Sequence, residues 1–307
     1  MAEPDRDRAV GRQCVSRPLA RRPLPCIPEQ IWACYLVCVG AIAVLAPGGG
    51  SPQHDVATFF LVHAGIATAV AFCAACARRS QRAARWPRAA LTIAGLPIVF
   101  SALCWLLPAV HPEPYELVWR SFDRWLFGAD LAVAIGTLPP WLVEVLQIDY
   151  AAFYFLCIGS TLLALRSSGV AAFDRAVVLM VGGFLCSYLG YLLVPTIAPK
   201  VVLQDLPPLE GLWLTQSLRT WIDGAEMNHW DCFPSGHTMM TTTSLIVLWR
   251  WARRSFWWLL LPGLALIAST MLLRYHWCAD VLAGATIAWP CVRLCDWLMA
   301  RGGWPPA

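Results

Sequence analysis

Long apolar stretches separated by short polar segments dominate this chain. Eight of them approach the ~20 residues that an α-helix needs to cross a bilayer. They lie near residues 30–46, 56–77, 89–110, 147–165, 176–195, 237–252, 256–273 and 279–299. The first and the sixth are short for a crossing. The pattern predicts an all-α, polytopic membrane helical bundle with about eight transmembrane helices.

Composition favours the same class. Hydrophobic residues make up 58% of the 307 positions, charged residues only 14%, and mean hydropathy is +0.57. A soluble globule of this length needs more polar surface than that. We expect one unit with a cytoplasmic Arg- and Pro-rich tail at 1–28 that does not resemble a signal peptide. Two additional membrane helices joined by a basic cytoplasmic loop would follow at 29–88, then a six-helix core at 89–299 and a short cytoplasmic tail at 300–307.

The basic residues predict an orientation. Arginines crowd the N-terminal tail and the segment between the second and third apolar stretches, and they recur at every second loop. By the positive-inside rule these segments are cytoplasmic. Both termini would then be cytoplasmic, and the face that carries most carboxylates would be extracytoplasmic. We expect a bacterial cell membrane. The Arg-rich, Lys-poor usage indicates a GC-rich genome and nothing more.

Most of the 13 cysteines fall inside the apolar stretches, where a small side chain packs. Cys73 and Cys76 have a redox or zinc spacing, but no second ligand pair accompanies them. Cys232 and Cys278 differ, because each lies within a few residues of a histidine on the predicted oxidising face. A disulfide between them is one hypothesis.

Two segments outside the apolar stretches are unusual. Residues 115–127 mix Trp and Phe with Arg and Asp at helical spacing, which suggests an interfacial helix. Such a helix would either cover the bundle or assist lipid entry. Residues 196–233 are rich in Pro and acidic side chains, and a loop of that length beside a chemical motif is typical of a lid or headgroup selector.

The most informative motif is Arg274-Tyr275-His276, with Asp280 four residues after the histidine. In a helix, positions i and i+4 share a face, so Asp280 can fix the tautomer of His276 and leave the other ring nitrogen as a nucleophile. Arg274 could hold phosphoryl oxygens beside that nitrogen. A proton relay or a packing contact would produce the same pair.

A second motif, Pro234-Ser235-Gly236-His237, stands at the start of an apolar stretch. Ser235 suits a helix N-cap, Gly236 allows a ligand to approach the backbone, and the free N–H groups of a helix start attract an anion such as phosphate. His237 could protonate a leaving oxygen as a general acid. Taken alone, the four residues fit a capped helix with an interfacial histidine better than they fit a phosphate site.

Lys200 is the only lysine of the chain and follows Pro195 and Pro199 at the predicted outer membrane edge. It could bind phosphate or simply extend to the interface, as lysines near membrane edges do.

Together, the ordered elements Pro195…Lys200, Pro234–His237 and Arg274…Asp280…Gly284 resemble the type-2 phosphatidic acid phosphatase superfamily over residues 89–299. The resemblance implies six helices, a phosphohistidine at His276 oriented by Asp280, and His237 as general acid. It implies phosphate binding by Arg274, Ser235, Gly236 and Lys200, with no metal and no cofactor.

The chain departs from the common pattern, since Arg-Pro does not follow Lys200 and the third motif has Ser269-Thr270 where Ser-Arg is usual. Arg274-Tyr275-His276 and the segment Asp123…Gly128…Asp130 are similar to the inositol phosphorylceramide synthase branch, which transfers a phosphorylated headgroup. Asp123 and Asp130 receive no role. We expect a phosphorylated lipid substrate, membrane lipids as partners and no nucleic acid.

Several alternatives stay open at this level. Water as acceptor gives a lipid phosphatase, and a lipid hydroxyl gives a phosphotransferase. A transporter using the same residues as a proton relay, or an inactive scaffold, is the non-enzymatic interpretation. The sequence leaves the lipid and the oligomeric state unassigned.

Overall fold

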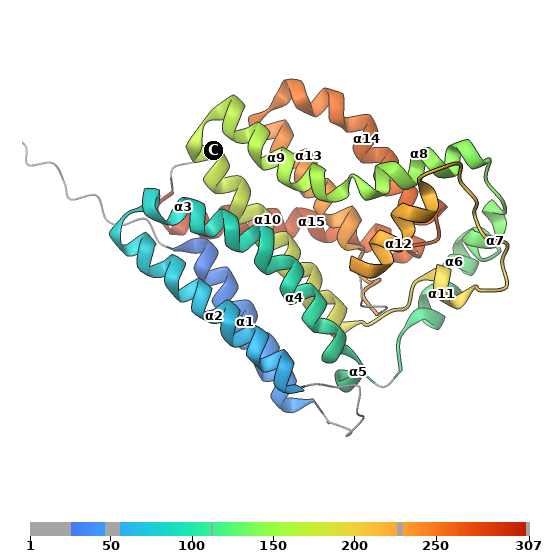
Figure 1. Ribbon diagram of the computed structural model, residues 1–307, viewed down its shortest axis with the longest axis horizontal. Helices are drawn as coiled ribbons and strands as arrows, with labels where there is room; N and C mark the ends of the chain where they lie inside the picture. The colour runs from blue at the N-terminus through green and yellow to red at the C-terminus, as the bar shows by residue number, and fades with distance from the viewer. Residues whose placement is uncertain (1–25, 47–55, 112, 226–229, 305–307) are drawn as a thin grey trace, which may run out of the picture.

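The computed structural model describes residues 26–46, 56–111, 113–225 and 230–304 (Figure 1). These residues form helices joined by short connections, and an isolated bridge between Thr196 and Asp231 is the sole β-type pairing among them. The all-α prediction is confirmed for this part of the chain.

The helices of the first half run up to residue 135. They are α1 (Ile27–Leu45), α2 (Val56–Arg79), α3 (Gln81–Ala90), the π-helix η1 (Leu91–Gly95), α4 (Leu96–Ala102), the 3₁₀-helix η2 (Leu103–Trp105), α5 (Leu107–Val110), α6 (Glu116–Phe127) and α7 (Leu131–Ile135).

The helices of the second half begin at residue 140. They are α8 (Pro140–Ala151), α9 (Phe153–Ser168), α10 (Val170–Leu193), α11 (Pro199–Val202), α12 (Thr215–Ala225), α13 (Gly236–Trp251), α14 (Arg253–Leu272) and α15 (Cys278–Arg301).

Six helical segments are long and apolar enough to cross a membrane, and a seventh arises if α8 and α9, bent by 48°, count as one span. The expected span that does not qualify is the sixth of the eight, 237–252, which is the helix α13. It has 16 residues and so is about 24 Å long at 1.5 Å per residue, which is shorter than the ~30 Å hydrocarbon core. By length and composition, the protein is therefore an integral membrane protein of six or seven candidate spans, and α13 is shorter than the helices that qualify.

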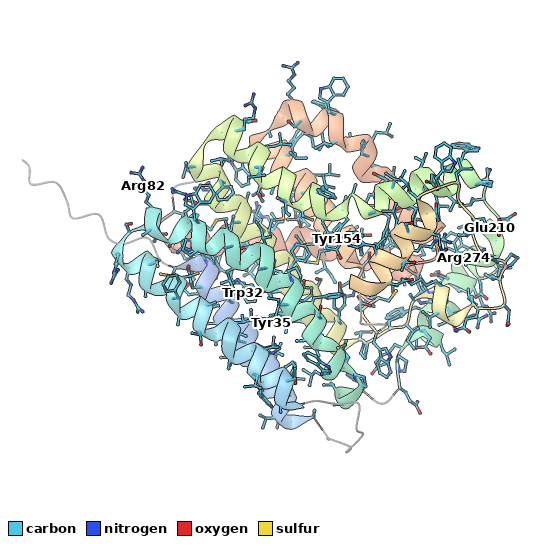
Figure 2. All side chains as sticks on the ribbon, in the orientation of Figure 1. Trp32, Tyr35, Arg82, Tyr154, Glu210 and Arg274 are labelled. Carbon is cyan, nitrogen blue, oxygen red and sulfur yellow. The ribbon has the colours of Figure 1, made fainter. Side chains whose placement is uncertain are left out.

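The basic segment between the second and third spans is helical, which corrects the expected loop. Ser80 alone separates α2 from α3, and its hydroxyl caps α3 by accepting the amide of Ala83. The third span consequently runs over Gln81–Trp105 rather than 89–110. The arginines of this turn lie at one end of the molecule, and Arg82 and Arg274 mark opposite ends (Figure 2).

The central helix is α10, which packs against α1, α9, α13 and α15. Its apolar window is 72% buried, against 22% to 44% for the other candidate spans, so it is the helix around which the rest assemble. Helices α1 to α4 form a group on one side of it, with Trp32 and Tyr35 between them (Figures 1 and 2). Tyr35 contacts Tyr188 of α10 edge to face.

Helix α6 confirms the predicted amphipathic helix outside the spans. Its outward face carries exposed aromatic residues such as Trp125, whereas Asp123 on its inward face is almost completely buried. Helix α6 packs on α15, so it covers the bundle at the end where the two motifs lie. The segment 196–233 is more ordered than a simple loop, since its described residues include α11 and α12.

A buried ion pair joins the first helix to the third. Arg88 donates from two guanidinium nitrogens to Glu29, and both side chains are almost fully buried. A buried pair that loses one partner leaves an uncompensated charge, which typically costs about 3–5 kcal/mol.

We therefore expect Glu29→Gln to lower the stability of the detergent-solubilised protein by about 3 kcal/mol. The comparison is Asp174→Asn, which weakens the more exposed Arg85–Asp174 pair between α3 and α10. That change should cost about 1 kcal/mol or less. Thermal unfolding of both variants in one detergent measures the difference. Equal losses of stability would show that the buried Arg88–Glu29 pair matters no more than the more exposed pair.

Candidate active site

His276 lies in the loop between α14 and α15, just before the helix that carries Asp280. The first turn of α15 is capped at Trp277, whose amide donates to Asp280 Oδ2 at 2.9 Å. His276 is therefore outside the helix, and the expected pairing of two positions on one helix face is wrong. Its Nδ1 lies 3.6 Å from Asp280 Oδ2, which is longer than a hydrogen bond.

The thiol of Cys232 occupies the space between these two side chains. Its Sγ is 3.2 Å from His276 Nδ1 and donates to Asp280 Oδ2 at 2.9 Å. Cys232 and Cys278 are both free thiols, so the hypothesis of a disulfide between them is wrong for this structure. Burial and the neighbouring Asp280 carboxylate raise the pKa of the Cys232 thiol well above its ordinary value.

The second motif begins α13 as its sequence predicted. Ser235 is the N-cap, and its hydroxyl accepts the amide of Thr238 at 3.2 Å. Gly236 lines the cavity, and its missing side chain also has a packing reason. A Cβ at this position would lie 2.1 Å from the hydroxyl of Tyr191, so the missing side chain admits the tyrosine of α10.

His237, on the first turn of α13, is enclosed by aromatic rings from the bend between α8 and α9. Tyr150 stacks on it with ring centroids 4.4 Å apart, and Phe153 lies at 4.3 Å on the other side of the bend. The hydroxyl of Tyr150 is 3.4 Å from Nδ1 of His237. The ring centroids of His237 and His276 are 5.9 Å apart, so one phosphate group can contact both histidines.

Lys200 is the second residue of the short helix α11 and lies beside these histidines at the cavity end. Its amide donates to the carbonyl of Arg274, and its ammonium lies 4.4 Å from the ring centroid of Tyr275. The same ammonium forms a 2.6 Å ion pair with Asp223 of α12. The helices α11 and α12 thus hold Lys200 and its partner Asp223 at the site.

Unlike Lys200, Arg274 contacts backbone carbonyls rather than a carboxylate. Its guanidinium donates to the carbonyls of Pro207 and Gly136 at 2.8 and 3.0 Å, and the side chain is buried. Burial, with a smaller effect of Arg219, lowers the pKa of Arg274. These contacts tie three loops together, and they direct the charge away from the two histidines toward backbone oxygens.

The two motif loops meet through backbone. Ser235 donates its amide to the carbonyl of Asp280 at 2.9 Å, just before α13 begins. At Gly284, one turn further along α15, an added Cβ would lie 2.5 Å from the carbonyl oxygen of Ser235. Because backbone cannot yield as a flexible side chain does, Gly284 sets the separation of the two helices.

Asp123 and Asp130, which had no assigned role, support the same end of the bundle. Asp123 of α6 accepts the amide of Cys278 at 3.1 Å and so supports the start of α15. Burial raises its pKa, and the amide bonds oppose that effect. Asp130 accepts hydrogen bonds from Arg120 and Arg124, which lower its pKa and close the corner between α6 and α7.

A largely apolar cavity of about 580 Å³ extends from the histidines into the bundle. Lys200, Cys232, Gly236, His237 and His276 line one end, and Trp86 and Phe173 line the other. Residues of α3, η1, α4, α9 and α10 form most of its walls. Figure 1 shows the ribbons of these helices as neighbours. The wall from Trp86 to Phe100 extends about 21 Å at 1.5 Å per residue, most of the thickness of a hydrocarbon core.

Sequence reasoning missed several members of this site. Tyr150 and Phe153 come from an apolar stretch in which nothing marks them as neighbours of His237. The sequence suggests Cys232 only as a disulfide partner, although its position five residues before His237 is a usable signal. Ser235 and Arg274 were expected to bind phosphate, yet neither lines the cavity among the described residues.

The fold and the site define a polytopic membrane protein whose anion-attracting residues close one end of an apolar cavity. The chain belongs to the PAP2 superfamily, because a family model of that description matches residues 116–294, more than half of its length. Membership supports phosphatase or phosphotransferase chemistry in general. No curated protein and no solved structure matches the chain. The matched region begins at α6, so α1 to α5 lie outside it.

We expect Gly284→Ala to abolish most activity, because the new methyl group forces the Ser235 carbonyl away and shifts His237 relative to His276. A displacement near 1 Å can cost about 100-fold in rate. Gly159→Ala on α9 is the control, since a Cβ added there would meet nothing within 4 Å. Turnover of a phosphorylated lipid is compared after both variants elute as monodisperse protein in detergent. Full activity of Gly284→Ala would show that the close approach of Gly284 to the Ser235 carbonyl does not position the histidines.

Proposed function

We propose that this protein is a membrane lipid phosphate phosphatase that cleaves a phosphate ester or diphosphate at the extracytoplasmic face. The observation that carries the proposal is the convergence of His276, His237 and Lys200 on the end of one long apolar cavity. A soluble phosphate compound would not need that cavity, whereas a lipid places its phosphate at the polar end and its chain along the walls.

The reaction proceeds in two steps. The Nε2 atom of His276 attacks phosphorus, since Nδ1 faces Cys232 and Asp280. The bond from phosphorus to the lipid oxygen breaks, and His237 gives that oxygen a proton. His237 then takes a proton from water, the hydroxide attacks phosphorus, and the N–P bond breaks to release phosphate and restore His276.

Charge stabilisation falls to two groups. The ammonium of Lys200 at the cavity end neutralises phosphoryl oxygens once they compete with Asp223, and the amides at the start of α13 add the positive end of a helix dipole. Arg274 contributes by fixing the loop that carries His276, through its bonds to Pro207 and Gly136. This replaces the direct phosphate contact expected from its sequence position.

The covering segments offer a place for headgroup recognition. Trp221 of α12 lines the cavity, and Asp223 of the same helix holds Lys200. Withdrawal of α12 would therefore both open the cavity end and free the lysine for phosphate. We propose that α12 acts as the lid or selector.

The orientation rests on the placement of basic residues. Arg250 and Arg301 lie at the helix ends remote from the motif loops, because α13 and α15 begin at the motifs and end at these arginines. By the positive-inside rule, that end is cytoplasmic and the site is extracytoplasmic.

Transfer of a phosphorylated headgroup to a lipid hydroxyl, as in the inositol phosphorylceramide synthase branch, is the second candidate. The observation that favours it is the apolar cavity itself, which can admit an acceptor lipid while keeping bulk water low. Both candidates share attack by His276.

We expect metal-free phosphate release in detergent from at least one lipid in a panel of phosphatidate, a prenyl diphosphate and phosphoinositol lipids. Release should fall to background in His276→Ala, because the nucleophile is gone. His63→Ala on α2 is the control, since that ring bonds the carbonyl of Phe59, remote from the cavity end.

Lipid products are resolved in the same samples with and without ceramide or diacylglycerol. A new phosphorylated lipid that requires the acceptor would establish the transferase instead. Activity that His276→Ala leaves intact would reject both reactions.

The cavity also predicts discrimination by chain length. Ala90 lines it on α3, about 15 Å along the helix axis from Phe100, so Ala90→Trp should block the far part of a long chain. Each methylene that loses burial costs about 0.8 kcal/mol, so exclusion of two lowers kcat/KM by more than about tenfold.

Short-chain substrates should react normally with Ala90→Trp. The matched control is Ala67→Trp on the exposed side of α2, which does not line the cavity. Equal losses for long and short chains would show that the cavity does not hold the chain.

A further inference from the structure

The side chains behind the proposed nucleophile form a chain of three rather than a pair. Cys232 is 2% exposed, His276 is 7% exposed and Asp280 is fully buried, so water competes little with their mutual contacts. Their Nδ1, Sγ and Oδ2 atoms lie within 4.8 Å of one another. The thiol lies closer to each partner than the partners lie to each other.

The chemistry of the attack requires a defined tautomer. Nε2 of His276 must carry the lone pair that bonds phosphorus, so the ring proton must be on Nδ1. That N–H needs an acceptor in a buried site. At 3.6 Å the Asp280 oxygen is too far for a good hydrogen bond, whereas Sγ at 3.2 Å is short for one to sulfur.

We propose, on the basis of the proposed function, that Cys232 is a positioning residue that links His276 to Asp280. Its sulfur accepts a hydrogen bond from Nδ1–H of His276, and its S–H group donates a hydrogen bond to Asp280 Oδ2 at 2.9 Å. The link fixes the Nδ1–H tautomer and transmits the negative charge of Asp280 toward the ring. When Nε2 bonds phosphorus and the imidazole becomes positive, this charge stabilises it.

Several contacts keep the thiol in this position. The carbonyl of Tyr275 lies 3.3 Å from Sγ, and the amide of Cys232 donates to the carbonyl of Thr196 at 3.1 Å. Because the pKa of the thiol is raised, it keeps its proton near neutral pH and remains a donor. A cysteine that only filled space would not need His276 on one side of its sulfur and Asp280 on the other.

A measurement independent of activity tests the tautomer. In protein labelled with ¹⁵N-histidine, the signal of His276 is assigned among the six histidines by comparison with His276→Gln. We expect the Nδ1–H tautomer in the native protein and in Cys232→Ser, whose hydroxyl can both accept and donate. Cys232→Ala should give a mixture of the two neutral tautomers.

Kinetics give the second readout. Cys232→Ala should lower kcat by at least about tenfold and change KM less, because the polar contacts of the thiol are with His276 and Asp280, and Cys232→Ser should restore most of kcat. Cys278→Ala, which removes a neighbouring buried thiol outside the three-atom cluster, is the control and should leave kcat unchanged.

The outcomes separate this proposal from the function on which it rests. Loss of phosphate release in His276→Ala, with a normal tautomer and normal kcat in Cys232→Ala, would overturn the role of Cys232 alone. A tautomer that depends on Cys232 would support the link even if no substrate of the panel reacts. Activity lost on chelation and restored by Zn²⁺ would instead identify the three side chains as a metal site and overturn the proposal.

Discussion

The site depends on how closely the backbones of α13 and α15 approach at their N-terminal ends. Ser235 donates its amide to the carbonyl of Asp280, and Gly284 leaves no Cβ where the Ser235 carbonyl lies. The start of α13, which carries His237, and the start of α15, which follows His276, are thereby fixed through backbone groups that cannot change rotamer. A contact between flexible side chains would allow the two helix starts to move by about 1 Å, which is enough to lower a catalytic rate about 100-fold. The small residues of the motifs are thus as important to the site as its titratable ones.

The rest of the bundle acts on this junction from three sides. Helix α10 brings Tyr191 into the space above Gly236, and the bend between α8 and α9 presents Tyr150 and Phe153 to His237. Helix α6 supports the start of α15 through Asp123. The supports from α8, α9 and α10 come from largely apolar helices, whereas the support from α6 comes from an amphipathic helix.

The N-terminal helices have a role beyond adding surface. Helices α3 and α4 form a wall of the cavity although they precede the region that matches the PAP2 superfamily. The ion pair of Arg88 with Glu29 holds this wall to α1, and Tyr35 packs on Tyr188 of α10. The family match over 116–294 therefore covers the end of the cavity that holds the two histidines and leaves out the wall formed by α3 and α4.

The sequence by itself determined the membrane class, the helical content and the motif residues, because hydrophobic length and helix capping are local properties. The sequence could predict Ser235 as an N-cap and an amphipathic helix near 116–127 for that reason. Only the tertiary structure decided that Cys232 lies between His276 and Asp280 and that Arg274 contacts carbonyls. These facts depend on which side chains from distant segments share one buried volume. Spacing along one helix cannot give them, since His276 lies just outside the helix that the spacing assumed.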